Sequence, residues 1–234
     1  MKNSSPSWSK EQVLDLLKQN ARPQELEGMA RFGMSIGNRL GVSVPVMRKI
    51  AKQVKKNHLL ALELWETGIA EARIVAALIA DVGQLTESQM EAWVKDFDSW
   101  DVCDQICMNL FDKTPLAWQK VRDWSEREEE FVKRAAFALI ACLAWHDKTA
   151  PDQKFCDLLP IIERASTDSR NFVKKSVNWA LRHIGKRNIS LNKAALKSAR
   201  KIHQIDSKTA RWIASDAVRE LESEAVQNRL RKKK

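Results

Sequence analysis

Hydrophobic residues recur every three or four positions along almost the whole chain, and alternating runs are few. This spacing places apolar side chains on one face of successive α-helices. Residues that begin or end helices punctuate the pattern: Pro45 after Ser43, the capping box of Thr86 and Gln89, Ser99, Pro115 and Gly185. Because the connections are short and no linker interrupts them, we expect an all-α protein of roughly a dozen helices.

Two of the expected helices resemble each other. FVKRAAFALIACLAW and FVKKSVNWALRHIGK share their first three residues and a base at the fourth. Their first residues, Phe131 and Phe172, lie about 40 residues apart, the period of HEAT-type repeats. We therefore predict a curved right-handed solenoid of antiparallel helix pairs, an ARM-type superhelix of HEAT-like repeats. It would form a single domain over residues 1–234, with a basic tail from about residue 226, and its concave face would suit a long partner.

The net charge of +10 is unevenly distributed. Residues 166–204 contain ten bases and one acid, and residues 39–58 contain six bases and no acid. Segregated positive charge is typical of proteins that bind nucleic acid, although a basic surface can also serve solubility. The bases of these blocks that we expect to contact DNA are Arg48, Lys174, Lys175, Arg182, Lys186 and Arg187.

Several classes of protein and site are disfavoured. The longest apolar run, residues 135–145, is too short to cross a bilayer, and the N-terminus lacks a signal-peptide pattern, so we expect a cytoplasmic protein. The four cysteines form no C-x-x-C pair, and no histidine lies near Cys103 and Cys107 in the sequence. Phosphate-binding loops, serine-hydrolase elbows and zinc-protease motifs are missing from the sequence. We expect neither a metal nor a cofactor.

A helical wheel of residues 172–186 separates an apolar stripe from a basic side. The stripe comprises Val173, Val177, Ala180, Leu181 and Ile184. Trp179 falls near Arg182, on the flank that also carries Lys175 and Lys186. An indole beside cations suits contact with a nucleotide, and packing against an adjacent helix is the alternative.

The segment FDSWDVCDQICMNLF is acidic within this basic chain. Trp100 and Asp104, one helical turn apart, share a helix face, whereas Asp101 is explained by the helix dipole alone. Cleavage of an N-glycosidic bond builds positive charge on the sugar, which a fixed carboxylate stabilises. Asp104 is therefore a candidate catalytic group. Arg134, at the margin of an apolar helix, suits either a structural salt bridge or an outside partner.

Four segments in the same order resemble the AlkD-like DNA alkylation repair proteins, bacterial HEAT-like-repeat DNA glycosylases: GVSVPVMRKIAK, WDVCDQ, FVKRAAFALIA and FVKKSVNWALRHIGKRN. The resemblance implies excision of cationic N3- and N7-alkylated purines from duplex DNA, without metal, cofactor or base flipping, in the bacterial cytosol and nucleoid. It also implies catalytic roles for Trp100, Asp104 and Trp179, with Arg182 beside Trp179, and a phosphate contact for Arg134.

One departure from this family concerns Ser99, where members carry a second aromatic residue that would help to grip the sugar. The sequence retains Trp100, Asp104, Arg134 and Trp179, which favours an active alkylpurine glycosylase that binds alkylated duplex DNA. Because the sequence has no long coiled-coil heptad pattern, we expect a monomer. Two alternatives stay open. One is a non-catalytic module that binds damaged or unusual DNA structures, and the other is a helical-repeat scaffold for an acidic protein.

Overall fold

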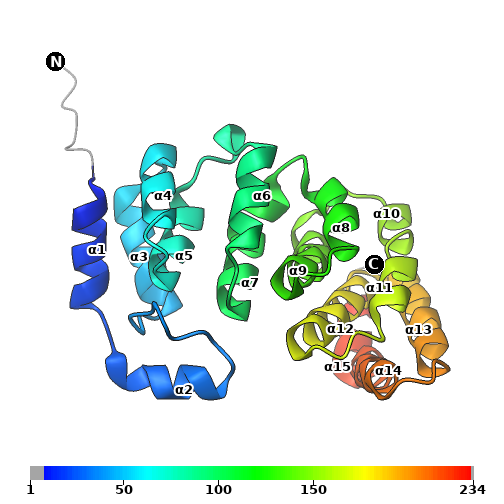
Figure 1. Cartoon of the computed structure of the whole chain (residues 1–234). Coiled ribbons are helices and arrows are strands. Elements are labelled where there is room, and N and C mark those ends of the chain that lie inside the picture. Colours follow the sequence, from blue (N-terminus) through cyan, green and yellow to red (C-terminus); the bar gives the residue numbers. More distant parts are fainter. Residues whose placement is uncertain (1–7, 233–234) are drawn as a thin grey trace. The chain divides into compact units, whose positions relative to one another are not determined.

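The computed structural model describes residues 8–232 (Figure 1). Regular structure in this range is entirely helical, which confirms the all-α prediction. It includes fifteen α-helices, more than expected, because short helices such as α2 (Leu26–Arg31) and α10 (Asp152–Cys156) occupy presumed connections. The helices form two compact units, of which unit 1 ends at Thr114 and unit 2 begins at Pro115. The single-domain assignment stays a prediction.

Unit 1 is built from short helices in two layers. The helices α3, α5 and α7 pack side by side, and α4 packs on α5. The bounds are α1 (Lys10–Gln19), a 3-10 helix (Pro23–Glu25), α2 (Leu26–Arg31), α3 (Val44–Val54), α4 (His58–Trp65), α5 (Ala70–Ile79), a 3-10 helix (Val82–Gln84), α6 (Glu87–Lys95), α7 (Trp100–Asn109) and a 3-10 helix (Phe111–Lys113). The predicted capping box at the start of α6 is present: Thr86 and Gln89 each bond the other's backbone N–H.

A buried carboxylate holds the turn before α3. Glu71, fully buried on α5, accepts hydrogen bonds from the backbone N–H groups of Leu40, Gly41 and Val42, at 3.0, 2.7 and 3.2 Å. Gly41 has a φ of 79°, and a Cβ there would lie 2.4 Å from the carbonyl oxygen of Arg22. Only glycine fits this backbone and this close approach.

Unit 2 has two clear layers. One contains α9, α12 and α14, and the other contains α8, α11 and α13. Figure 1 shows these helices in green to orange. The bounds are α8 (Ala117–Ser125), α9 (Glu130–His146), α10 (Asp152–Cys156), α11 (Leu159–Ala165), α12 (Asn171–Gly185), α13 (Ile189–His203), α14 (Lys208–Leu221) and α15 (Glu224–Arg231). The sequence predicts Pro115 in the first turn of α8. The residue lies before the helix instead, because Leu116 occupies the N-cap position.

Contacts between residues 38 apart join successive helix pairs of unit 2. They link Glu126 with Arg164, Arg134 with Phe172, Glu163 with Lys201, Asn178 with Asp216, and Arg182 with Glu220. The rings of Phe131 and Phe172 stack with their centroids 5.4 Å apart. The predicted repeat of about 40 residues is therefore confirmed. As predicted, α12 ends at Gly185, where a Cβ would meet Leu221 at 2.6 Å.

The apolar stripe predicted for α12 is fully buried, as is most of the apolar run of α9. None of the helices in the described range, α9 included, combines the length and the apolar character needed to span a membrane. The core of unit 2 thus lies between its two helix layers, and the polar side of α12 is left to carry the candidate functional groups.

Candidate nucleic-acid interface

The helix α7 buries one face in unit 1 and carries the candidate carboxylate on another. Its core residues have exposed fractions of 1% or less: Val102, Cys103, Ile106, Cys107 and Leu110. Cys103 and Cys107 thus lie within the core. Among residues 8–232, no group of three or more histidine, cysteine or acidic side chains is placed to bind a metal. The expected independence of metals stays a prediction.

Trp100 and Asp104 are both half-buried, one helical turn apart on α7. The indole N–H of Trp100 donates a hydrogen bond to the backbone carbonyl of Phe32 at 3.1 Å. This contact ties the indole to the segment that follows α2. The two side chains predicted to work together are thus held near each other by the local helix, and partial exposure leaves room for a partner.

The N-terminus of α7 is held by a polar network that the sequence did not predict. The two outer nitrogens of the Arg39 guanidinium donate to the two carboxylate oxygens of Asp101 at 2.7 and 2.8 Å. The arginine side chain is 3% exposed and the aspartate side chain 17%. Asp101 is therefore half of a largely buried bidentate ion pair. Its explanation by the helix dipole alone was wrong.

Ser99 occupies the N-cap position of α7 as predicted, but its side chain makes no capping bond to the helix. Its hydroxyl donates to Asp101 at 2.6 Å and accepts from the backbone N–H of Ser35 at 3.2 Å. The residue is fully buried. An aromatic side chain at this position would have to displace the network, so Ser99 and Arg39 form one local arrangement.

The predicted basic flank of α12 is a region of mixed charge in unit 2. Arg182 lies 2.5 Å from Glu220 and 3.6 Å from Asp216, and Lys186 lies 2.7 Å from Glu220. Both acids belong to α14, beyond the basic window of residues 166–204. Trp179, on the same flank, is half-buried. Arg182 and Lys186 are thus already paired, and a DNA role for them stays a prediction.

Two other expected DNA contacts are engaged inside the protein. Arg134 is 5% exposed and donates to the backbone carbonyl of Phe172 at 2.7 Å, which joins α9 to α12. The ammonium of Lys174 lies 4.9 Å from the ring centroid of Trp212, a cation–π contact. Lys175 and Arg48 differ, because both are exposed and neither has an ion-pair partner among residues 8–232. These two are the predicted contacts most accessible to DNA.

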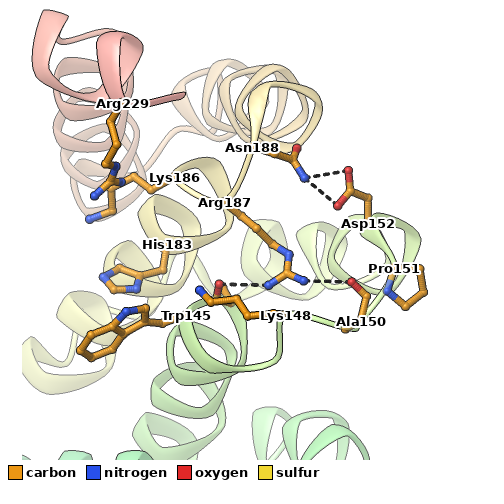
Figure 2. A pocket seen from close by; sticks show the side chains of 11 residues that line it. Trp145, Lys148, Ala150, Pro151, Asp152, His183, Lys186, Arg187, Asn188 and Arg229 are labelled. Carbon is orange, nitrogen blue, oxygen red and sulfur yellow. Dashed lines mark hydrogen bonds between the residues drawn. The ribbon is translucent and has the colours of Figure 1, made fainter. Parts of the chain in front are cut away.

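A basic pocket that the sequence did not predict lies in unit 2 at the C-terminal ends of α9 and α12 (Figure 2). Its volume is about 830 Å³. The lining residues are Ala144, Trp145, Lys148, Ala150, Pro151, Asp152, His183, Lys186, Arg187, Asn188 and Arg229. Three segments separated in sequence contribute to it, so only the fold brings them together. The sequence feature that could have indicated this pocket is Trp145 at the end of the apolar run, followed by Lys148.

His183 lies between this pocket and Trp179, whose ring it meets edge-on at 5.5 Å. Burial, together with the positive charges of Lys186 and Arg182, lowers the pKa of His183 from 6.5 to about 4. At neutral pH the imidazole is therefore uncharged, and the surroundings of this side of the pocket are positive.

The lowered pKa of His183 predicts an acid-sensitive stability. Between pH 6.5 and 4 the unfolded chain binds a proton that the folded chain does not, so stability is full above pH 6.5 and declines as the pH falls toward 4. We expect a loss of about 2 kcal/mol between pH 7 and pH 5. Urea unfolding at both pH values should show this loss in the wild type and not in His183→Gln. An equal pH dependence in both proteins would contradict the assignment.

A family model described as DNA alkylation repair enzyme matches residues 13–221. None of the curated proteins compared with the chain matches it. A solved structure described as "A new family of proteins related to the HEAT-like repeat DNA glycosylases with affinity for branched DNA structures" is 19% identical. It has a TM-score of 0.76 and covers 91% of this chain and 95% of that chain.

Two further solved structures are less similar. An engineered protein is 16% identical, with a TM-score of 0.43 and coverage of 94% of this chain and 93% of that chain. A designed armadillo repeat protein in complex with the peptide (KR)4 is 14% identical, with a TM-score of 0.36 and coverage of 94% and 96%. The likeness at a TM-score of 0.76 confirms the HEAT-like repeat fold. The family match confirms the resemblance drawn from four sequence motifs, and the chain belongs to the DNA alkylation repair enzyme family.

Proposed function

We propose that the protein is a monofunctional DNA glycosylase that hydrolyses the N-glycosidic bond of cationic N3- and N7-alkylated purines in duplex DNA. The observation that carries this proposal is Asp104, a half-buried carboxylate one turn after Trp100, in a chain of the DNA alkylation repair family. The indole of Trp100 is held by the Phe32 carbonyl, so it offers a fixed apolar wall beside the carboxylate.

The proposed chemistry needs only a carboxylate and water. The bond between C1′ of the sugar and the purine nitrogen breaks, and its electron pair leaves with the base, which neutralises the positive charge of the alkylated purine. Positive charge then builds on the sugar, where the carboxylate of Asp104 stabilises it. Water adds to C1′ and its proton passes to solvent. The charge that the substrate already carries makes the base a good leaving group, so an additional general acid is unnecessary.

Binding of branched DNA without chemistry is the second candidate. The observation in its favour is the shared fold with the solved structure at a TM-score of 0.76, whose description includes affinity for branched DNA structures. The pairing of Arg182 and Lys186 with Glu220 also fits this candidate, since the engaged bases leave fewer cations for one continuous track along a duplex.

One assay separates the two candidates. Purified protein is incubated with methylated duplex DNA, and released bases are resolved by chromatography. Affinity for an unmodified duplex and for a four-way junction is measured in parallel. We expect release of 3-methyladenine or 7-methylguanine at a rate above that of the buffer control. Absence of release, together with tighter binding of the junction than of the duplex, would reject the glycosylase proposal and favour the binding function.

Lys175 is expected to contact a DNA phosphate, because it is exposed on α12 and has no ion-pair partner among residues 8–232. Lys175→Ala should therefore flatten the plot of log affinity against log salt concentration by about one unit. Arg164→Ala is the control, since Arg164 pairs with Glu126 and lies on α11, in the other helix layer. The same slope for wild type and Lys175→Ala would place the DNA elsewhere.

A further inference from the structure

The basic pocket of unit 2 has walls held by hydrogen bonds. The Arg187 guanidinium donates to the backbone carbonyls of Ala144 and Ala150 at 3.2 and 2.9 Å (Figure 2). The side-chain amide of Asn188 donates to both carboxylate oxygens of Asp152 at 2.8 and 3.0 Å. These contacts fasten the end of α9, the loop after it and the start of α10 to the loop after α12. The pocket is therefore built into the repeat and does not need a ligand to form.

Two cations of the pocket are not used by this scaffold. Lys148 and Arg229 are exposed, and their side chains have no hydrogen-bond or ion-pair partner among residues 8–232. Lys186 also points into this region, with its ammonium 2.7 Å from Glu220 (Figure 2). The lining includes four lysine and arginine residues and one acid, and that acid, Asp152, is already bonded to Asn188. Glu220 compensates Lys186, so Lys148 and Arg229 are the two cations that favour an anionic ligand.

The pocket also presents a flat aromatic surface. Trp145, the last residue but one of α9, keeps 51% of its surface exposed. The ring centroids of His146 and Trp145 lie 4.6 Å apart at an interplanar angle of 31°. An exposed indole next to unpartnered cations is the combination that proteins use to stack a base and hold its phosphate.

We propose that this pocket binds one unpaired nucleotide of a DNA strand, with the base stacked on Trp145 and the adjacent phosphate between Lys148 and Arg229. A base inside a duplex cannot stack on the indole, because both of its faces are covered by its neighbours, so the proposed occupant is a nucleotide in a single-stranded arm. This contact is separate from the proposed excision site, because it involves neither Asp104 nor α7. It would allow the protein to bind DNA that has both paired and unpaired strands.

The neutral state of His183 supports this assignment. Its pKa of about 4 reflects burial first and then the cations Lys186 and Arg182. A phosphate placed in the pocket would offset that positive field and raise the pKa of His183. The imidazole thus reports on occupancy of the pocket independently of affinity, by the pH dependence of its NMR signals with and without DNA.

The test compares two fluorescent probes that contain no lesion: a blunt duplex, and the same duplex with a short oligothymidine arm. We expect wild type to bind the armed duplex more tightly, as measured by anisotropy. Trp145→Ala should weaken binding of the armed duplex roughly 5- to 150-fold, the range for loss of one base–aromatic stack, whereas Trp145→Phe should retain most of the affinity. Lys148→Ala and Arg229→Ala should each flatten the salt dependence by about 0.7.

Lys197→Ala serves as the matched control, because Lys197 is an exposed lysine of α13 in the other helix layer. Equal affinity of wild type for both probes, or equal affinities of Trp145→Ala and Lys197→Ala for the armed duplex, would overturn the proposal. Competition with free dAMP tests whether the ligand is a free nucleotide. The dAMP is added at concentrations that leave the blunt duplex bound. If dAMP displaced the arm at a concentration equal to that of the armed duplex, a DNA strand would be rejected as the occupant. Because no probe contains a lesion, these outcomes do not depend on glycosylase activity.

Discussion

Asp104→Asn is expected to slow single-turnover release of a methylated purine by about 10²–10³, which corresponds to about 3–4 kcal/mol of lost transition-state stabilisation. Asparagine preserves the size of the side chain and the geometry of α7 but removes the negative charge that would face the sugar. Affinity for DNA should be kept or slightly increased, because a charge that repels phosphate is removed from a basic protein. Loss of rate without loss of binding is the pattern of a catalytic group.

Asp98→Asn is the matched control for this experiment. Asp98 belongs to the same acidic segment and is exposed, so its replacement makes the same change of net charge outside the helix face of Asp104. We expect Asp98→Asn to release the base at nearly the rate of wild type. Asp101 is unsuitable for this purpose, because it forms an ion pair with Arg39. If Asp104→Asn were as fast as Asp98→Asn, Asp104 would have no catalytic role.

The helices and their repeat could be predicted because they depend on short-range rules. A capping box needs only residues three apart, and the structure contains the one expected at Thr86 and Gln89. The apolar stripe of α12 follows from 3.6 residues per turn. The similarity of the segments that begin at Phe131 and Phe172 reflects their equivalent places in adjacent repeats, where their rings stack.

The partners of the site residues depend on longer distances in sequence. The helical wheel of α12 places Arg182 and Lys186 on one side of that helix, but it gives no information about the side chains of α14. Glu220 pairs with both cations and follows Arg182 by 38 residues. Glu220 lies outside residues 166–204, the window in which the positive charge is concentrated. The repeat itself could have located Glu220, since the same offset joins Asn178 to Asp216.

The residues of the network at the start of α7 are not related by the repeat offset. Arg39 and Asp101 are 62 residues apart, and Arg39 lies in a non-helical segment between α2 and α3. No spacing rule connects such positions, so the sequence supported only the dipole explanation for Asp101. The pocket at Trp145 could not be predicted for the same reason, because Arg229 lies on α15, which is distant in sequence from Trp145.

Asp101→Asn is expected to lower the free energy of unfolding by about 3–5 kcal/mol, the usual cost of leaving one partner of a buried ion pair without its counter-charge. The Arg39 side chain is 3% exposed, so water cannot replace the carboxylate. Asparagine keeps one side-chain oxygen, so the Ser99 hydroxyl and the Arg39 guanidinium would share a single acceptor. Urea unfolding followed by circular dichroism at neutral pH measures this loss, with Asp98→Asn expected within about 0.5 kcal/mol of wild type.

The size of the loss separates two explanations of the same residue. An acid that acts only through the helix dipole contributes about 0.3–1 kcal/mol, and its contribution is independent of Arg39. A bidentate pair gives a double-mutant cycle with Arg39→Gln in which the two single losses do not add. A loss below about 1 kcal/mol with additive effects would show that the ion pair contributes little. A large, non-additive loss would identify Arg39 and Asp101 as the contact that holds the segment after α2 against α7, and with it the carbonyl to which the Trp100 indole is bonded.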